Sequence, residues 1–231
     1  AYNAAQFLEE VVSRVPSEIN IKAIHIINDG SEDQTQVIAE KLALQDPRIT
    51  PHEFSENSGY GAVVKYGIQQ CLKSSTDWIF CLHGDAQYPP ESLPEMLRLA
   101  QEQKLDLVQG SRHAQGGAIQ GGMPYYKWLA GQVLVGFENF IFSEKMSDYH
   151  SGMLLYKSDL FNKINWTNLS PSFDIDLEII ASAISTQHSI GEVSIPTRYG
   201  DEESYLNPIH YGLRVLQVLW RFKRGRYRSI D

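Results

Sequence analysis

The 231-residue sequence lacks several features that would assign it to a specialised class of protein. No run approaches the roughly 18 consecutive apolar residues that spanning a bilayer requires. No secretory signal, a basic segment followed by an apolar one, is visible at the start. Only two cysteines occur, Cys71 and Cys81, and their spacing is not that of metal ligands. We interpret them as buried free thiols in a reducing compartment.

The sequence also lacks an excess of positive charge, because 28 acidic and 20 basic residues give a net charge of −8. Without a global positive field to attract phosphate backbones, a nucleic-acid partner is not expected. The charge is unevenly spread, however. One C-terminal stretch carries six basic residues and no acid, namely Arg214, Arg221, Lys223, Arg224, Arg226 and Arg228.

Apolar segments with two different periods alternate along the chain. Apolar runs of strand length fall at residues 21–27, 49–54, 78–82, 105–109, 151–156 and 190–195, and helical spacing falls at 7–15, 34–44, 61–70, 91–103, 124–142 and 173–186. Asn3 and Gln6 are expected to cap the first helix. Strands that alternate with helices indicate βαβ units. We therefore predict an α/β, Rossmann-like fold whose mainly parallel sheet has helices on both faces.

The predicted order of elements begins with a helix, directly after Ala1-Tyr2-Asn3. A doubly wound sheet normally begins with a strand whose C-terminal loop helps to form the ligand crevice. We therefore expect that a first strand precedes Ala1 and is missing from this chain. We expect one catalytic domain over residues 1–205, followed by a basic amphipathic helix or tail over residues 206–231.

Three polar clusters follow predicted strands: Asn28-Asp29-Gly30, His83-Gly84-Asp85-Ala86-Gln87 and Gly110-Ser111-Arg112. Ligands of parallel sheets bind beyond such strand ends. Asp85 and Gln87 are alternate residues of an extended segment, so their oxygens can share one hard cation, Mg²⁺ or Mn²⁺. The alternative is that Asp85 only caps a turn before the helix that Pro89-Pro90 begins.

These clusters belong to six segments that, in order, resemble the landmarks of family 2 glycosyltransferases with the GT-A fold. The segment at residues 83–91 is similar to the "D.Q.PPE" form of the metal segment in dolichol- and polyprenyl-phosphate sugar transferases. The resemblance covers about residues 2–205, and Tyr2-Asn3 fits the loop after the family's first strand. The six segments are residues 26–35, 56–62, 83–91, 110–112, 147–152 and 198–204.

The resemblance implies roles for particular residues. It implies a donor site for a nucleotide-diphosphate sugar at Tyr2, Asn3, Asp29, Asp85, Arg112, Lys127 and Arg198, and a metal site at Asp85 and Gln87 with His83 as a further ligand. Arginines would bind the phosphates and offset the charge that develops on the leaving group, a catalytic role for Arg198. Asp148 is the implied catalytic base or acceptor-orienting carboxylate. Alternatively, Arg112 forms a surface salt bridge and Asp148 caps a turn.

The sequence departs from the family pattern at two positions. Asn28 and His83 each stand where the family carries the first Asp of a pair. Imidazole suits softer cations than Mg²⁺, so His83 either favours Mn²⁺ or only lines the site.

The implied activity is inverting transfer of a sugar to an acceptor, a polyprenyl or dolichyl phosphate or another cell-envelope glycan acceptor. A lipid phosphate is already anionic and needs no general base. The basic C-terminal segment either lies in a membrane interface or docks on the domain. We expect a cytoplasmic protein, peripheral at the inner face of the cytoplasmic membrane.

The rival interpretation is a non-catalytic sugar-nucleotide-binding or membrane-scaffold module. A dinucleotide-binding oxidoreductase would need G-x-G-x-x-G after a strand, which the Asn28-Asp29-Gly30-Ser31 turn lacks.

Overall fold

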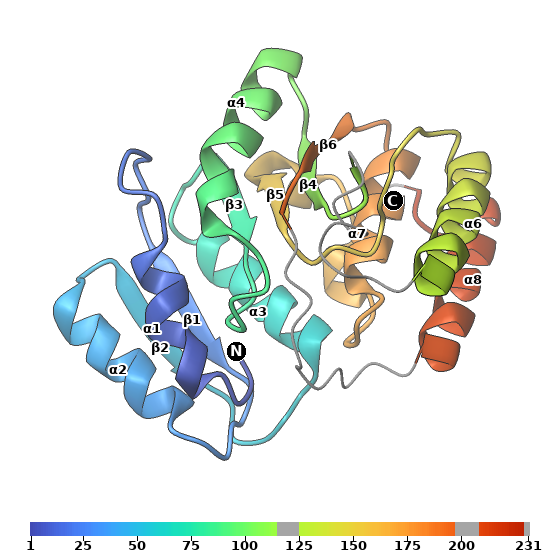
Figure 1. Ribbon diagram of the computed structural model, residues 1–231. Coiled ribbons are helices and arrows are strands. Elements are labelled where there is room, and N and C mark those ends of the chain that lie inside the picture. The colour runs from blue at the N-terminus through green and yellow to red at the C-terminus, as the bar shows by residue number, and fades with distance from the viewer. Residues whose placement is uncertain (115–124, 197–207, 229–231) are drawn as a thin grey trace.

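The computed structural model describes residues 1–114, 125–196 and 208–228 (Figure 1). The strands are β1 (Ile24–Asn28), β2 (Ile49–Glu53), β3 (Trp78–Cys81), β4 (Leu107–Ser111), β5 (Leu154–Lys157) and β6 (Ile190–Ser194). The α-helices are α1 (Ala5–Ser13), α2 (Thr35–Gln45), α3 (Tyr60–Leu72), α4 (Leu93–Gln103), α6 (Tyr125–Phe142), α7 (Ile175–Ser185) and α8 (Pro208–Lys223).

The strands form two sheets. β1 and β2 pair in parallel, and the other four strands are ordered β3-β5-β4-β6. β4 and β6 are parallel, but β5 runs antiparallel to both of its neighbours. The α/β prediction is confirmed, and the sheet is mixed rather than mainly parallel. Hydrophobic periodicity predicts where β5 lies but carries no information about its direction, so the sequence did not indicate this strand's orientation.

Ala1 lies beside the C-terminal end of β1. Its amino group donates a hydrogen bond to the Ile27 carbonyl (2.7 Å), and its carbonyl accepts one from the Asp29 amide (2.9 Å). Ala1 thus bonds to the residues before and after Asn28, which is the hydrogen-bond pattern of a parallel neighbouring strand. On its other side Ala1 packs against Gly84, where an added Cβ would lie 3.2 Å from the Ala1 Cβ. Ala1 therefore links the end of β1 to the loop after β3, and the expected first strand stays a prediction.

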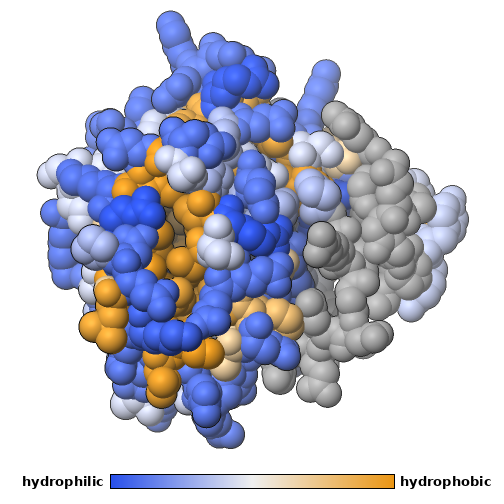
Figure 2. Space-filling model, turned by 60° about the vertical axis from the view of Figure 1, so that its left-hand side comes forward, coloured by the Kyte–Doolittle hydropathy of each residue, from blue (hydrophilic) through white to orange (hydrophobic). Residues whose placement is uncertain are grey.

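Apolar residues pack on both faces of the four-stranded sheet. Leu154 and Tyr156 of β5 point into the cluster that α3, α7 and α8 complete. Leu155 points into the opposite cluster, with Met96 and Ala100 of α4. Figure 1 shows α4 and α7 on either side of these strands, so the predicted coverage of both faces is confirmed. In Figure 2 hydrophilic residues cover most of the face turned to the viewer, with apolar residues in a band between them.

Helix α8, which covers most of the predicted basic tail, docks on the domain. Val215, Val218 and Leu219 are buried in the larger apolar cluster. Two ion pairs join it to the start and the first turn of α7, Arg214 with Asp174 (3.0 Å) and Arg221 with Glu178 (2.9 Å). Leu213, Leu216 and Trp220 remain exposed. The docking alternative is therefore correct for one face of this helix, and a second apolar face is left over.

The two cysteines are free and half-buried, Cys71 in α3 and Cys81 in β3. Burial raises the pKa of the Cys71 thiol to about 11 and that of Cys81 to about 12. Both are therefore protonated and unreactive at neutral pH, as expected from the sequence.

A histidine pair joins β1 to β2. His25 Nδ1 lies 3.1 Å from His52 Nε2, and the other ring nitrogen of His52 lies 3.1 Å from the Tyr66 hydroxyl on α3. Burial lowers the pKa of both histidines, and the charges of Lys73 and, for His25, of His52 lower it further. The pair is therefore neutral in the folded state near neutral pH.

The lowered pKa values predict a loss of stability at mildly acidic pH. The unfolded chain gains protons on these histidines below about pH 6.5, whereas the folded chain resists protonation, so the contribution of this pair to the free energy of unfolding falls as the pH drops. Urea titrations between about pH 7.5 and pH 5.5 measure this loss. His25→Asn should make the loss smaller, while His188→Asn, outside the pair, should leave it intact. Equal losses in all three proteins would contradict the prediction.

Candidate active site

The three polar clusters after β1, β3 and β4 are joined by direct contacts. Ala1 bridges Asp29 and Gly84, as described above. Gly152 packs against His83, and the adjoining segment that carries His150 accepts a hydrogen bond from Arg112. The strand ends therefore form one continuous polar edge, as the sequence predicts for a ligand crevice.

Asp29 organises the loop before α3. Its Oδ1 accepts a hydrogen bond from the Ser58 amide (2.8 Å), and its Oδ2 accepts one from the Gly59 amide (3.1 Å). Position 61, in the first turn of α3, accommodates only glycine, because an added Cβ would lie 2.4 Å from the Ser170 carbonyl oxygen. Asp29 is 4% exposed, so it shapes the crevice wall. A contact between Asp29 and a nucleotide stays a prediction.

Tyr2 and Asn3 lie at the surface next to this wall. The Asn3 amide donates to Ser31 Oγ (2.9 Å), and its side-chain Oδ1 accepts from the Glu32 amide (3.0 Å). The prediction that Asn3 caps the first helix is wrong, because Asn3 binds the loop after β1 while Asp33 accepts from the Ala5 amide. The exposed Tyr2 ring is therefore anchored to that loop through its neighbour.

Asn28, the first departure from the family pattern, is fully buried. Its Oδ1 accepts a hydrogen bond from the Ser31 amide at 3.0 Å. The side chain therefore closes the turn after β1, which an amide oxygen does as well as a carboxylate. This substitution leaves the crevice geometry intact.

The candidate metal segment brings a ring nitrogen of His83 and a carboxylate oxygen of Asp85 near each other. Asp85 Oδ1 accepts a hydrogen bond from the Gln87 amide (3.1 Å), so the predicted turn-capping contact is present. The other oxygen, Oδ2, lies 3.8 Å from His83 Nδ1. In the described part of the chain, no group of three or more His, Cys, Asp or Glu side chains could hold a metal ion. Divalent cations at such sites take one or two protein ligands and complete their shell with water and substrate phosphates, so His83 and Asp85 fit this chemistry.

His83 is held from behind by residues that sequence reasoning did not single out. Its Nε2 lies 3.1 Å from the Tyr60 hydroxyl, which donates to Asp176 Oδ2 (2.8 Å). Gly152 leaves room for the ring, since an added Cβ would lie 2.2 Å from Nε2. Burial raises the pKa of Asp176 to about 6 against the lowering effect of the Tyr60 hydrogen bond. Tyr60 and Gly152 stand inside motifs of the family pattern, whereas Asp176 lies in a predicted helix with no local signal.

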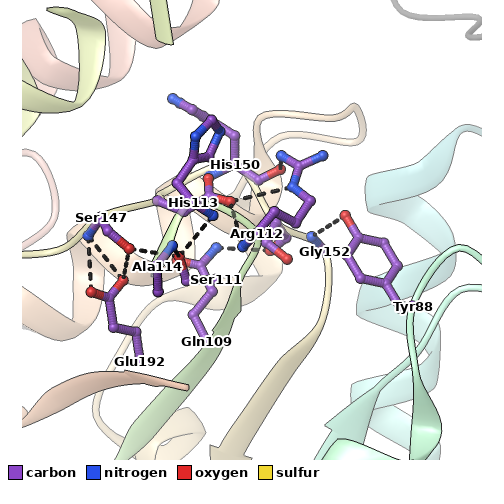
Figure 3. Close-up of polar contacts among 12 residues, drawn as sticks. Tyr88, Gln109, Ser111, Arg112, His113, Ala114, Ser147, His150, Gly152 and Glu192 are labelled. Carbon is purple, nitrogen blue, oxygen red and sulfur yellow. Dashed lines mark hydrogen bonds and ion pairs between the residues drawn. The ribbon is translucent and has the colours of Figure 1, made fainter. Parts of the chain in front are cut away.

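Arg112 is bound at the end of β4 by the segment before β5 (Figure 3). Its Nε lies 3.3 Å from Asp148 Oδ2, and its Nη2 donates to the His150 carbonyl (2.9 Å). Asp148 is 1% exposed and also accepts from the His150 amide (2.8 Å). Burial acts to raise the pKa of Asp148, but the charges of Arg112 and His150 outweigh it, so this pKa lies below its usual value. The salt-bridge alternative for Arg112 is therefore correct in part, since the pair forms but is largely buried rather than at the surface.

His150 connects this group to helices α6 and α8. Its Nε2 lies 3.2 Å from Glu138 Oε2, and its Nδ1 lies 3.0 Å from the Tyr211 hydroxyl. Burial lowers the pKa of His150, but the Glu138 and Asp148 carboxylates outweigh it and the pKa is raised. The polar edge of the sheet thus continues into both helices.

Two predicted donor residues cannot be compared with this geometry. Arg198 lies outside the described residues, and only the position of Lys127 in the first turn of α6 is described, not its side chain. Their phosphate-binding roles stay predictions.

Helix α6 exposes six of its apolar residues. Val133 is 69% exposed and Phe140 is 76% exposed, whereas Glu138 on the inner side is fully buried. The exposed set on α6 is Tyr125, Tyr126, Leu129, Val133, Phe137 and Phe140, and α8, which packs against α6, adds Leu213, Leu216 and Trp220. We call these nine residues the apolar face. None of the described helices is long and apolar enough to cross a bilayer.

Two known proteins are similar to this chain in sequence. The chain is 26% identical over 196 residues to the polyprenol monophosphomannose synthase of Mycolicibacterium smegmatis, covering 84% of this chain and 73% of that protein. It is 25% identical over 214 residues to the dolichyl-phosphate hexose transferase of Haloferax volcanii, covering 93% and 87%.

Solved structures show the same fold. A complex of glucosyl-3-phosphoglycerate synthase from Mycobacterium tuberculosis with Mn²⁺, uridine-diphosphate-glucose and phosphoglyceric acid matches all of this chain and 79% of that one, with a TM-score of 0.63 at 13% identity. The predicted GT-A fold is thereby confirmed. The sequence model of glycosyl transferase family 2 matches residues 1–164. The chain therefore belongs to glycosyl transferase family 2.

Proposed function

We propose that this glycosyltransferase moves a sugar from a nucleotide-diphosphate sugar to a polyprenyl or dolichyl phosphate, with inversion, at a membrane surface. The observation that carries the proposal is the continuous polar edge, on which Asp85 follows β3 and Arg112 follows β4, with β5 between the two strands. Both of the relatives described above are named for polyprenyl- or dolichyl-phosphate sugar chemistry, which supports the lipid acceptor.

The donor diphosphate is proposed to lie between Asp85 and Arg112. Asp85, His83 and Gln87 would hold a divalent cation, which when bound offsets charge on the departing nucleoside diphosphate. Arg112 is fixed by Asp148 before any ligand arrives, and a donor that is already oriented stabilises developing charge without reorganisation. Lys127 and Arg198 are proposed to contact the same phosphates, and Tyr2 and Asn3 to border the base.

Asp148 is proposed to orient Arg112 rather than to remove a proton. Both of its carboxylate oxygens already accept hydrogen bonds, and its lowered pKa makes it a weak base. A lipid phosphate is anionic near neutral pH and attacks without one. A hydroxyl acceptor would instead need a base within hydrogen-bond reach, so the Asp148 base hypothesis and the identity of the acceptor are linked.

The apolar face supports a membrane location. Apolar residues exposed over two adjacent helices mark a contact with another apolar phase. Lys223 in the last turn of α8, with Arg224, Arg226 and Arg228 after it, would attract anionic lipid. A lipid acceptor could then present its phosphate to His150 and Arg112, whose segment contacts both helices. We therefore propose a peripheral protein at the cytoplasmic face of the membrane.

Donor binding is tested by calorimetry with UDP- and GDP-sugars, with and without Mn²⁺ or Mg²⁺. We expect metal-dependent binding of one nucleotide class, weakened by Asp85→Ala at least about tenfold because a ligand to the cation is lost. Asp159→Ala removes an exposed carboxylate elsewhere and should bind as the unchanged protein does. If the folded protein binds no sugar nucleotide, the rival scaffold module is favoured and the proposal fails.

The role of Asp148 is tested by Asp148→Asn, which keeps an acceptor oxygen but removes the charge. If Asp148 orients Arg112, the KM for the donor should rise and kcat should fall, each by about tenfold, since Arg112 both binds the diphosphate and stabilises its developing charge, and the acidic limb of the kcat profile should remain. A general base would instead lower kcat by about 10²–10⁴-fold. Steady-state kinetics across a pH series separates the two, because only loss of a base removes the acidic limb of the kcat profile.

Membrane binding is tested by flotation with vesicles that contain anionic lipid. We expect the protein to float, and Val133→Glu or Phe140→Glu to abolish flotation, since a charge on the apolar face opposes burial in the interface. Leu44→Glu is the matched control, because Leu44 is 90% exposed on α2, away from α6 and α8. Flotation that persists in the α6 variants and is lost in the control would overturn the assignment of this face.

A further inference from the structure

The imidazole of His83 stands where the family carries a carboxylate, and the structure determines how its protons are arranged. Its two ring nitrogens meet different partners, the Tyr60 hydroxyl at Nε2 and the Asp85 carboxylate near Nδ1. Which nitrogen carries the proton decides which one is able to bind a cation.

The Tyr60 hydroxyl settles the question, because it has one hydrogen to donate. That hydrogen goes to Asp176 Oδ2 at 2.8 Å. The phenol oxygen must then accept a hydrogen from His83 Nε2, 3.1 Å away. A neutral imidazole has only one N–H, so Nδ1 carries a lone pair.

This lone pair faces a second electron donor. Nδ1 lies 3.8 Å from Asp85 Oδ2, too far for a hydrogen bond. Two ligands of one cation, each bonded at about 2.1 Å, lie no more than about 4.2 Å apart. The separation of the two atoms lies within this limit, as a shared cation requires.

Packing fixes the His83 ring in this orientation. Tyr60 and Tyr88 contact it edge-on, with ring centroids 5.1 Å and 5.0 Å away. Gly152 lines the remaining side, where any Cβ would collide with Nε2. A ring turned by 180° would fill the same space but would present a carbon to the Tyr60 oxygen, so the Nε2 hydrogen bond keeps Nδ1 on the side of Asp85.

We propose that Tyr60 and Asp176 are positioning residues that hold His83 as a nitrogen ligand, so that the site prefers a transition-metal ion such as Mn²⁺ over Mg²⁺. The inference deepens the proposed function, on whose metal segment it rests. Imidazole binds first-row transition ions well and Mg²⁺ poorly. The histidine at position 83, in place of the family's aspartate, would then keep a metal ligand and change which ion the site prefers.

The test uses the full chain, freed of metal by a chelator, and Mn²⁺ alone as the probe. Pulsed electron paramagnetic resonance of bound Mn²⁺ should show ¹⁴N modulation from a directly bound imidazole, and His83→Asp should remove it. His83→Asp should also reduce the preference for Mn²⁺ over Mg²⁺ by about tenfold, measured by competition. Tyr60→Phe should weaken Mn²⁺ binding by about 10–100-fold, the usual effect of losing a partner that orients a ligand.

Tyr66→Phe is the matched control. It also removes a tyrosine hydroxyl from α3, but that hydroxyl contacts His52 and not His83. It should leave both the ¹⁴N signal and the affinity unchanged. Bound Mn²⁺ without ¹⁴N modulation in the unaltered protein would overturn the proposal, and this measurement does not depend on how any variant folds. Sugar-nucleotide binding in the same sample separates the two claims: binding without ¹⁴N modulation sinks only the role of His83, and ¹⁴N modulation without binding sinks only the transferase proposal.

Discussion

The buried carboxylate of Asp148 is the interaction on which the arrangement of the crevice depends. Removing a charged group from water costs several kcal/mol unless partners replace the lost hydration. Here the replacement comes from Arg112 at the end of β4 and from the His150 amide. His150 in turn contacts Glu138 and Tyr211. The Asp148 charge thus joins the end of β4 to the segment before β5, and His150 extends this network to α6 and α8.

Much of the architecture could be predicted from the sequence, because apolar periodicity and strand-end motifs are local signals. The α/β class, the coverage of both sheet faces and the GT-A fold are confirmed, and Asp29, Asp85 and Arg112 stand on one polar edge as expected. The direction of β5 could not be predicted, since an apolar run of four to six residues reads the same in either orientation. The N-cap prediction for Asn3 is wrong because a tertiary contact with the loop after β1 replaced a local one.

The residues behind the site could not be predicted either. Asp176 lies about 90 positions after His83 in the chain, and only the fold brings it to Tyr60. The apolar residues of α8 were expected to form a surface, but the α6 part of the apolar face was missed for a related reason. The 18 residues of α6 are apolar on nearly every side, so the sequence gives no contrast between inner and outer faces. The inner side is revealed by Glu138 and its partner His150, which is distant in sequence.

The insertion of β5 between β3 and β4 has a consequence for how the protein folds. β3, which precedes His83 and Asp85, and β4, which precedes Arg112, do not pair with each other. Both pair with β5, which is synthesised about forty residues after β4. Closing such a loop loses chain entropy before the pairing of β5 with its neighbours stabilises the closed form. During synthesis on the ribosome the crevice therefore assembles late, after residue 157 has emerged, and a nascent chain cut short before β5 would hold the parts of the site without their spacing.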